Sequence, residues 1–114
     1  MPLLTINSNI SLDRQAAQQL AFRASAHTAQ LLGKPEGYIM VQVVTDIIMS
    51  FAGNDEPCAR LELKSLGLPE SSTSAYSEEL CSIIEAETGI PPERIYIEFS
   101  SPARHMWGWD RRTF

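Results

Sequence analysis

Cysteine and histidine are scarce in this chain, and their scarcity excludes several classes of protein. The two cysteines, Cys58 and Cys81, are too few for the framework of a disulfide-stapled secreted domain. They also lack the Cys-x-x-Cys spacing of metal and redox sites, and the two histidines, His27 and His105, join no cluster of ligands. We therefore expect free thiols and no bound metal.

Positive charge and long apolar runs are also in short supply. Nine basic against fourteen acidic residues give a net charge of −5, which argues against binding to nucleic-acid phosphates or anionic membranes. No apolar run approaches the roughly 20 residues of a membrane-spanning helix, and the first residues do not resemble a secretory signal. We expect a cytoplasmic protein with no nucleic-acid or membrane partner, and the 114 residues fit one domain, 1–114.

The first half of the chain reads as strand, helix and strand. A β-favouring segment predicts a strand over residues 2–7, and apolar residues at helical spacing predict a helix over residues 11–32. We expect Ser11 to cap this helix and Gly33 to end it. The nearly unbroken β-favouring run of residues 38–44 predicts a strand covered on at least one face.

The second half repeats that order. Polar and apolar residues alternate over 60–64, helical spacing returns over 72–88, and residues 95–99 predict another strand. The stop signal Gly33-Lys34-Pro35 also recurs as Gly89-Ile90-Pro91. Two β-α-β repeats predict an α/β (α+β) fold with a four-stranded sheet and two helices on one face. We expect apolar residues on the uncovered face, which self-association would hide.

Pro2 directly follows Met1 at the start of the first predicted strand. Removal of Met1 would expose a secondary amine there, and this amine is our candidate catalytic base. In a chain that keeps Met1, the Pro2 nitrogen is an amide without basicity. Proline at the first position of a strand also occurs for purely structural reasons, because it costs no ladder hydrogen bond there.

Several short motifs, taken together and in order, resemble the macrophage migration inhibitory factor and D-dopachrome tautomerase family of the tautomerase superfamily. The resemblance covers the whole chain. It is carried by Met1-Pro2, Gly33-Lys34-Pro35 with Tyr38, Glu56-Pro57-Cys58-Ala59, Ser65-Leu66-Gly67, Pro92-Glu93-Arg94-Ile95-Tyr96-Ile97, Gly108-Trp109 and Thr113-Phe114. It implies a homotrimer whose sheets form a central barrel, with active sites between neighbouring subunits.

The resemblance also implies a reaction, the keto-enol tautomerisation of aryl pyruvates such as phenylpyruvate, without a cofactor. Pro2 would move the proton, Lys34 would bind the substrate carboxylate, and the amide of Leu66, beside Ser65, would stabilise the enol oxyanion. Burial and the charge of Lys34 would lower the pKa of the Pro2 amine. The remaining residues expected to line the site are Tyr38, Trp107, Trp109 and Phe114 of one subunit, with Tyr96 and Glu98 of its neighbour.

Three departures from the family pattern qualify these expectations. Glu98 stands where the mammalian proteins carry asparagine, and Trp107 stands where a small aliphatic residue is usual, so both would affect substrate preference. Leu61 replaces the second cysteine of the family's Cys-x-x-Cys, so thiol oxidoreductase activity is not expected.

Two alternatives stay open. The chain could act as a cytokine-like or host-modulating protein, released without a signal peptide, that binds a protein receptor and keeps only a vestigial pocket. The fold could also carry decarboxylation or hydration, as in other branches of the superfamily. Without the resemblance, Lys34 reads as a solvated residue at a helix end, and Trp107 and Trp109 read as packing residues.

Overall fold

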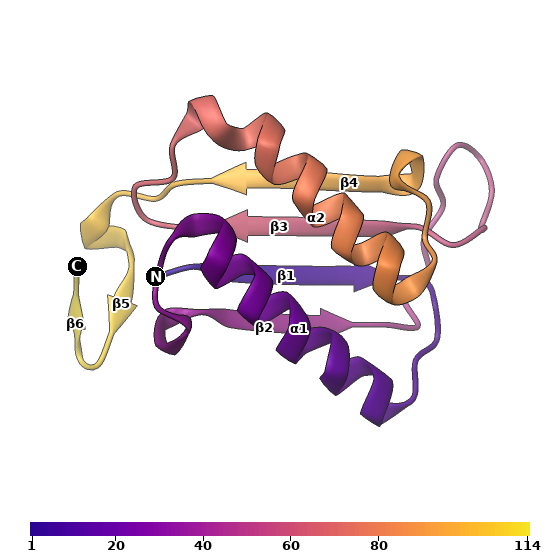
Figure 1. The fold of residues 1–114 in the computed structure, drawn as a ribbon, viewed down its shortest axis with the longest axis horizontal. Coiled ribbons are helices and arrows are strands. Elements are labelled where there is room, and N and C mark those ends of the chain that lie inside the picture. Colours follow the sequence, from indigo (N-terminus) through magenta and orange to yellow (C-terminus); the bar gives the residue numbers. More distant parts are fainter.

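A computed structural model describes all 114 residues, and Figure 1 shows their arrangement. The sheet has the order β2-β1-β3-β4, with β1 parallel to β2, β3 parallel to β4, and β1 antiparallel to β3. Both helices cross the same face of this sheet. The predicted pair of β-α-β repeats is therefore confirmed. The main elements are β1 (Leu3–Ser8), α1 (Arg14–Leu32), β2 (Met40–Val44), β3 (Ala59–Lys64), α2 (Thr73–Thr88) and β4 (Ile95–Ser100).

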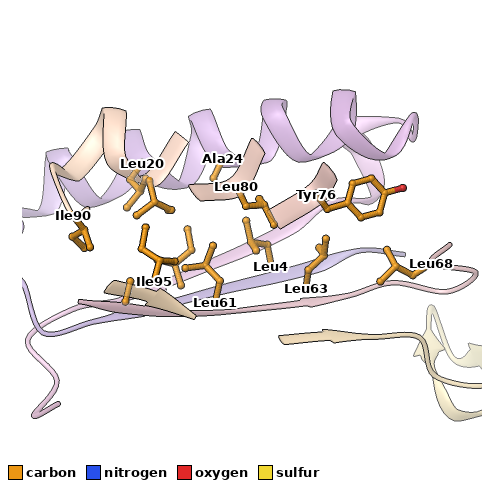
Figure 2. Packing of buried hydrophobic residues seen from close by; sticks show 13 residues of the cluster. Leu4, Leu20, Ala24, Leu61, Leu63, Leu68, Tyr76, Leu80, Ile90 and Ile95 are labelled. Atoms are coloured by element: carbon orange, nitrogen blue, oxygen red, sulfur yellow. The ribbon is translucent and has the colours of Figure 1, made fainter. Parts of the chain in front are cut away.

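The core lies between the sheet and the two helices (Figure 2). Side chains alternate along a strand, so every second residue of β1 and β3 faces the helices. Complete burial of each such leucine contributes about 1.5–3 kcal/mol. The core holds the start of β1 in place, and Pro2 lies there. Its buried residues include Leu4 and Ile6 of β1, Leu61 and Leu63 of β3, Leu20 and Ala24 of α1, and Leu80 and Ile84 of α2.

The uncovered face of the sheet carries both apolar and polar residues. Met40 of β2 and Tyr96 of β4 are exposed on it, as expected, and charged residues of β3 and β4 share this face. Arg60 lies 3.4 Å from Glu62 and 2.5 Å from Glu98, measured from its Nη2 to a carboxylate oxygen of each. Lys64 Nζ lies 3.3 Å from Glu62. The polar residues of β3 and β4 therefore form a network of two cations and two anions, whose formal charges balance.

The first helix begins later than predicted. Asp13 caps α1, and its side chain accepts a hydrogen bond from the backbone amide of Ala16 at 2.7 Å. The predicted cap, Ser11, instead donates to the side chain of Asp46. Both residues are good caps, and the tertiary contact of Ser11 with the loop after β2 decides between them.

The segment between α1 and β2 also differs from the prediction. Residues Glu36–Tyr38 form a 3₁₀ turn, so β2 begins at Met40 rather than at Tyr38. The Met40 amide donates to the Pro2 carbonyl at 3.0 Å, which joins this segment to the amino terminus. Tyr38 is thus placed beside the start of β1 and is about half exposed.

A short hairpin near the carboxyl terminus was not predicted. It consists of β5 (Gly108–Trp109) and β6 (Arg112–Thr113), with Trp109 opposite Arg112. Both turn residues, Asp110 and Arg111, have positive φ, a conformation that usually selects glycine or asparagine. Figure 1 shows the hairpin beside the amino terminus, so the two chain ends meet at one end of the sheet, where β1 begins. Neither helix combines the length and apolarity that a membrane crossing requires.

Candidate functional site

Pro2 lies at the start of β1, with less than 2 % of its surface exposed. The residue before it, Met1, carries the terminal amine. Burial lowers the pKa of this amine below its usual value, and the charges of Lys34 and Arg104 lower it further. The amine is therefore neutral over a wider pH range than an exposed terminal amine.

Lys34 reaches this end of the sheet because α1 ends at Leu32, two residues before it. Gly33 adopts the left-handed conformation (φ 64°) and terminates the helix as predicted. The Lys34 ammonium donates to Ser65 Oγ at 2.8 Å and to the Leu66 carbonyl oxygen at 2.9 Å. Two of its three N–H donors are thus used within the chain, and one remains for a bound anion. Burial lowers the pKa of Lys34.

Ser65 and Leu66 form the loop that follows β3, and both are buried. The Ser65 amide donates to the Ser100 carbonyl at 3.0 Å, which fixes this loop to the end of β4. The Leu66 amide makes no hydrogen bond within the chain. An unpaired N–H at this position is a donor that a bound oxyanion can use.

Trp109 is the centre of an aromatic wall beside these residues. Its ring stacks on Phe114, with centroids 6.0 Å apart and planes 9° apart. The ring of Tyr38 meets it edge-on at 6.1 Å. The Arg112 guanidinium lies 5.1 Å from the centroid of the Trp109 ring, within cation–π range.

Two neighbouring hollows, of about 340 and 350 Å³, share Met1, Tyr38 and Trp109 in their linings. The first also contains Lys34, Leu66 and Phe114. The second contains Pro2 and Trp107. Of the ten site residues named from the sequence, eight therefore gather at this end of the sheet: Pro2, Lys34, Tyr38, Ser65, Leu66, Trp107, Trp109 and Phe114.

Tyr96 and Glu98 do not join this group within one protomer. Tyr96 lies near the beginning of β4, at the end of the sheet opposite the amino terminus (Figure 1), and its ring packs on Phe51 with centroids 4.9 Å apart. Glu98 pairs with Arg60 on the uncovered face. Both residues are predicted from the sequence to belong to the site of a neighbouring subunit, and this stays a prediction.

Two arginines were not among the predicted site residues. Arg104 and Arg112 both line the hollow that contains Lys34, and no aspartate or glutamate lines it. No sequence signal marks Arg104. Arg112 could have been found from its pairing with Trp109, had the hairpin been recognised.

Neither cysteine lines the two hollows of this site. Cys58 is buried and Cys81 half-buried, both as free thiols, and burial raises the pKa of Cys81. Leu61, which stands three residues after Cys58, is fully buried in the core. No group of three or more His, Cys, Asp or Glu side chains is arranged to hold a metal ion.

The architecture is that of the tautomerase superfamily, and comparison with solved structures agrees closely. A macrophage migration inhibitory factor homologue from Prochlorococcus marinus matches with a TM-score of 0.92 and 40% identity over 98% of each chain. The factor from Trichinella spiralis matches with a TM-score of 0.91 and 31% identity, over 98% of this chain and 99% of that one.

Sequence comparison leads to the same family. Macrophage migration inhibitory factor of Meriones unguiculatus is 34% identical, and a homolog from Brugia malayi is 37% identical, each over all of this chain and 99% of the relative. The family model for macrophage migration inhibitory factor (MIF) matches residues 1–114. The chain belongs to the MIF family.

Proposed function

We propose that this protein is a cofactor-independent tautomerase of aryl pyruvates such as phenylpyruvate. In this proposal Met1 is removed and the amine of Pro2 acts as general base and acid. One observation carries the proposal: the terminal amine lies in a partly buried site where Lys34 and Arg104 lower its pKa. After processing, the amine would be the Pro2 nitrogen, one residue further along and at the buried start of β1. We expect burial and the two charges to lower its pKa in the same direction, and a neutral amine can accept a proton from carbon.

The residues around the amine suggest how the reaction proceeds. The free N–H of Lys34 binds the substrate carboxylate, and the aryl ring lies against Tyr38 and Trp109. The Pro2 amine removes a proton from C3 of the keto acid, the electron pair forms the C2–C3 double bond, and the carbonyl oxygen becomes an oxyanion. The Leu66 amide stabilises that oxyanion until it is protonated. A positioned base contributes about 10²–10⁴-fold in rate.

We also propose that residues 1–114 act as one domain within a homotrimer. The balanced charges on the uncovered sheet face can be buried against other copies without leaving an unpaired charge. Ile48, on the loop after β2, is 99% exposed, which suits a residue covered by a second subunit. In the trimer, Tyr96 and Glu98 of one subunit would complete the site of its neighbour.

The test is an ultraviolet assay of enol-phenylpyruvate decay, comparing processed wild type with Pro2→Gly. Glycine keeps a small second residue, so Met1 removal should continue, and mass spectrometry verifies it. We expect the substitution to lower the rate by about 10²-fold or more, while sedimentation shows an unchanged oligomer. Equal rates in the two proteins would exclude Pro2 as the base. No turnover by processed wild type would instead favour a protein ligand that binds a receptor.

A further inference from the structure

We propose that the site is built for a doubly anionic substrate, a 2-oxo acid whose flat body carries a second anionic group that Arg112 binds. This inference rests on the proposed tautomerase function and specifies its substrate class. Lys34 binds the 2-oxo carboxylate at the inner end of the hollow. Arg112 binds the second group at the outer end, with the planar body against Trp109 between them.

The first support is the local charge of the hollow. Lys34, Arg104 and Arg112 line it, whereas no acidic side chain does. The chain as a whole carries a net charge of −5, so its average field repels an anion. A concentration of three cations in one hollow of an acidic protein reverses that field locally and attracts anions.

The second support is that the three cations differ in their effect on the terminal amine. The charges that lower the pKa of the Met1 amine are those of Lys34 and Arg104, so both lie near the reacting end of a substrate. Arg112 is not among them, although it lines the same hollow. One carboxylate beside the amine therefore accounts for Lys34 and Arg104 and leaves Arg112 without a function in binding phenylpyruvate.

The third support is that Arg112 has no acidic partner within the chain. Arg23 pairs with Glu87, and Arg60 pairs with two glutamates, but Arg112 forms no ion pair, not even with Asp110 in the same hairpin. Its guanidinium lies over the Trp109 ring, and the antiparallel register of β5 and β6 holds the two side chains together. Stacking orders an arginine while leaving its in-plane N–H groups free for a bidentate contact.

A neighbouring subunit would not cancel this charge. The acidic residue expected from the neighbour, Glu98, is already paired with Arg60 of its own chain at 2.5 Å. That pair belongs to a balanced network with Glu62 and Lys64. Glu98 of a neighbour therefore brings little net charge to the hollow, and Arg112 stays available for the substrate.

The experiment uses two phenylpyruvate derivatives of nearly equal size, one with a para-carboxylate and one with a para-carboxamide. They differ mainly in one negative charge. For processed wild type we expect kcat/KM to favour the carboxylate by about tenfold, mostly through KM, and the preference should shrink as ionic strength rises. Arg112→Gln should bring the ratio near one. Arg112→Lys should retain part of the preference, because lysine keeps the positive charge but cannot make the two parallel hydrogen bonds of a guanidinium.

Arg111→Gln is the matched control, because it removes the same charge one residue away and outside this hollow. It should keep the wild-type ratio. Comparing variants cancels the intrinsic difference in reactivity between the two compounds. If processed wild type turns over both compounds by a Pro2-dependent route without favouring the carboxylate, or if Arg111→Gln loses the preference as Arg112→Gln does, this inference is wrong and the proposed function stands. If neither compound shows Pro2-dependent turnover while phenylpyruvate does, this inference is wrong and the proposed function stands. If phenylpyruvate also shows none, both proposals fail.

Discussion

The Lys34 ammonium nitrogen lies 2.9 Å from the carbonyl oxygen of Leu66, and this hydrogen bond joins the two halves of the molecule. Lys34 lies two residues after the end of α1 in the first β-α-β unit, whereas Leu66 lies two residues after the end of β3 in the second. The contact lies beside the amino terminus, where β1 begins. The site is therefore assembled by tertiary packing of both repeats.

Substitution of Lys34 should affect substrate binding more than that of Ser65. Lys34→Met removes the cation and its free donor, so we expect KM for phenylpyruvate to rise about tenfold or more. Ser65→Ala removes one acceptor of Lys34 but keeps the charge in the site. It should lower the free energy of unfolding by about 1 kcal/mol and leave KM within a few-fold of wild type. Steady-state kinetics and urea unfolding of both variants test this; equal KM values for the two would contradict it.

The pH dependence should follow the charges around the amine. Because Lys34 and Arg104 disfavour a protonated amine, loss of either charge raises the pKa of that amine. We expect Arg104→Gln to move the acidic limb of the kcat/KM profile to higher pH. The pKa of the amine should still stay below its usual value in this variant, because burial lowers it more than the charge of Arg104 does. Arg111→Gln serves as the control and should leave the limb in place. A downward movement in Arg104→Gln would refute the assignment.

Gly33 should be sensitive to alanine while Gly37 should not. Gly33 has φ 64°, where a Cβ strains the backbone, although no atom lies within 4 Å of the position a Cβ would take. We expect Gly33→Ala to reduce the free energy of unfolding by about 1–2 kcal/mol. Gly37 has equal space and an ordinary φ, so Gly37→Ala should change stability by less than about 0.5 kcal/mol. Chemical unfolding measures both, and equal losses would show that backbone strain is not the cause.

The two thiols should differ in reactivity. Cys58 is 1% exposed, whereas Cys81 is half-buried with a raised pKa. A thiol reagent under native conditions should therefore label Cys81 slowly and Cys58 not at all. Cys81→Ser should remove the labelling, and denaturation should expose Cys58.

The protein should reduce insulin weakly or not at all, because Leu61 stands in place of the second cysteine. Robust thiol-dependent turnover would contradict this.

Local sequence signals predicted most of the fold. Residue alternation in β3 and the glycine stops at Gly33 and Gly89 are local signals, and the structure agrees with them. The wrong predictions fall where contacts between distant segments determine the local structure. Serine is a favourable N-cap residue, but Ser11 donates its hydrogen bond to Asp46, and Asp13 caps α1 instead.

The site was less predictable than the fold, because its parts come from segments far apart in the chain. The resemblance supplied Pro2 and Lys34, but it did not point to Arg112. The turn that positions Arg112 places Asp110 and Arg111 in the left-handed conformation, and this residue pair is not a usual signal for it. A hairpin of two-residue strands also has too few residues to show alternation.

The central claim is that catalysis depends on the free amine of Pro2. The most direct measurement starts from protein that keeps Met1 and follows its treatment with a methionine aminopeptidase, recording intact mass and enol-phenylpyruvate decay in the same samples. We expect activity to rise in proportion to the fraction of chains that have lost one methionine, starting from a negligible rate. Full activity in material that retains Met1 throughout would contradict the account.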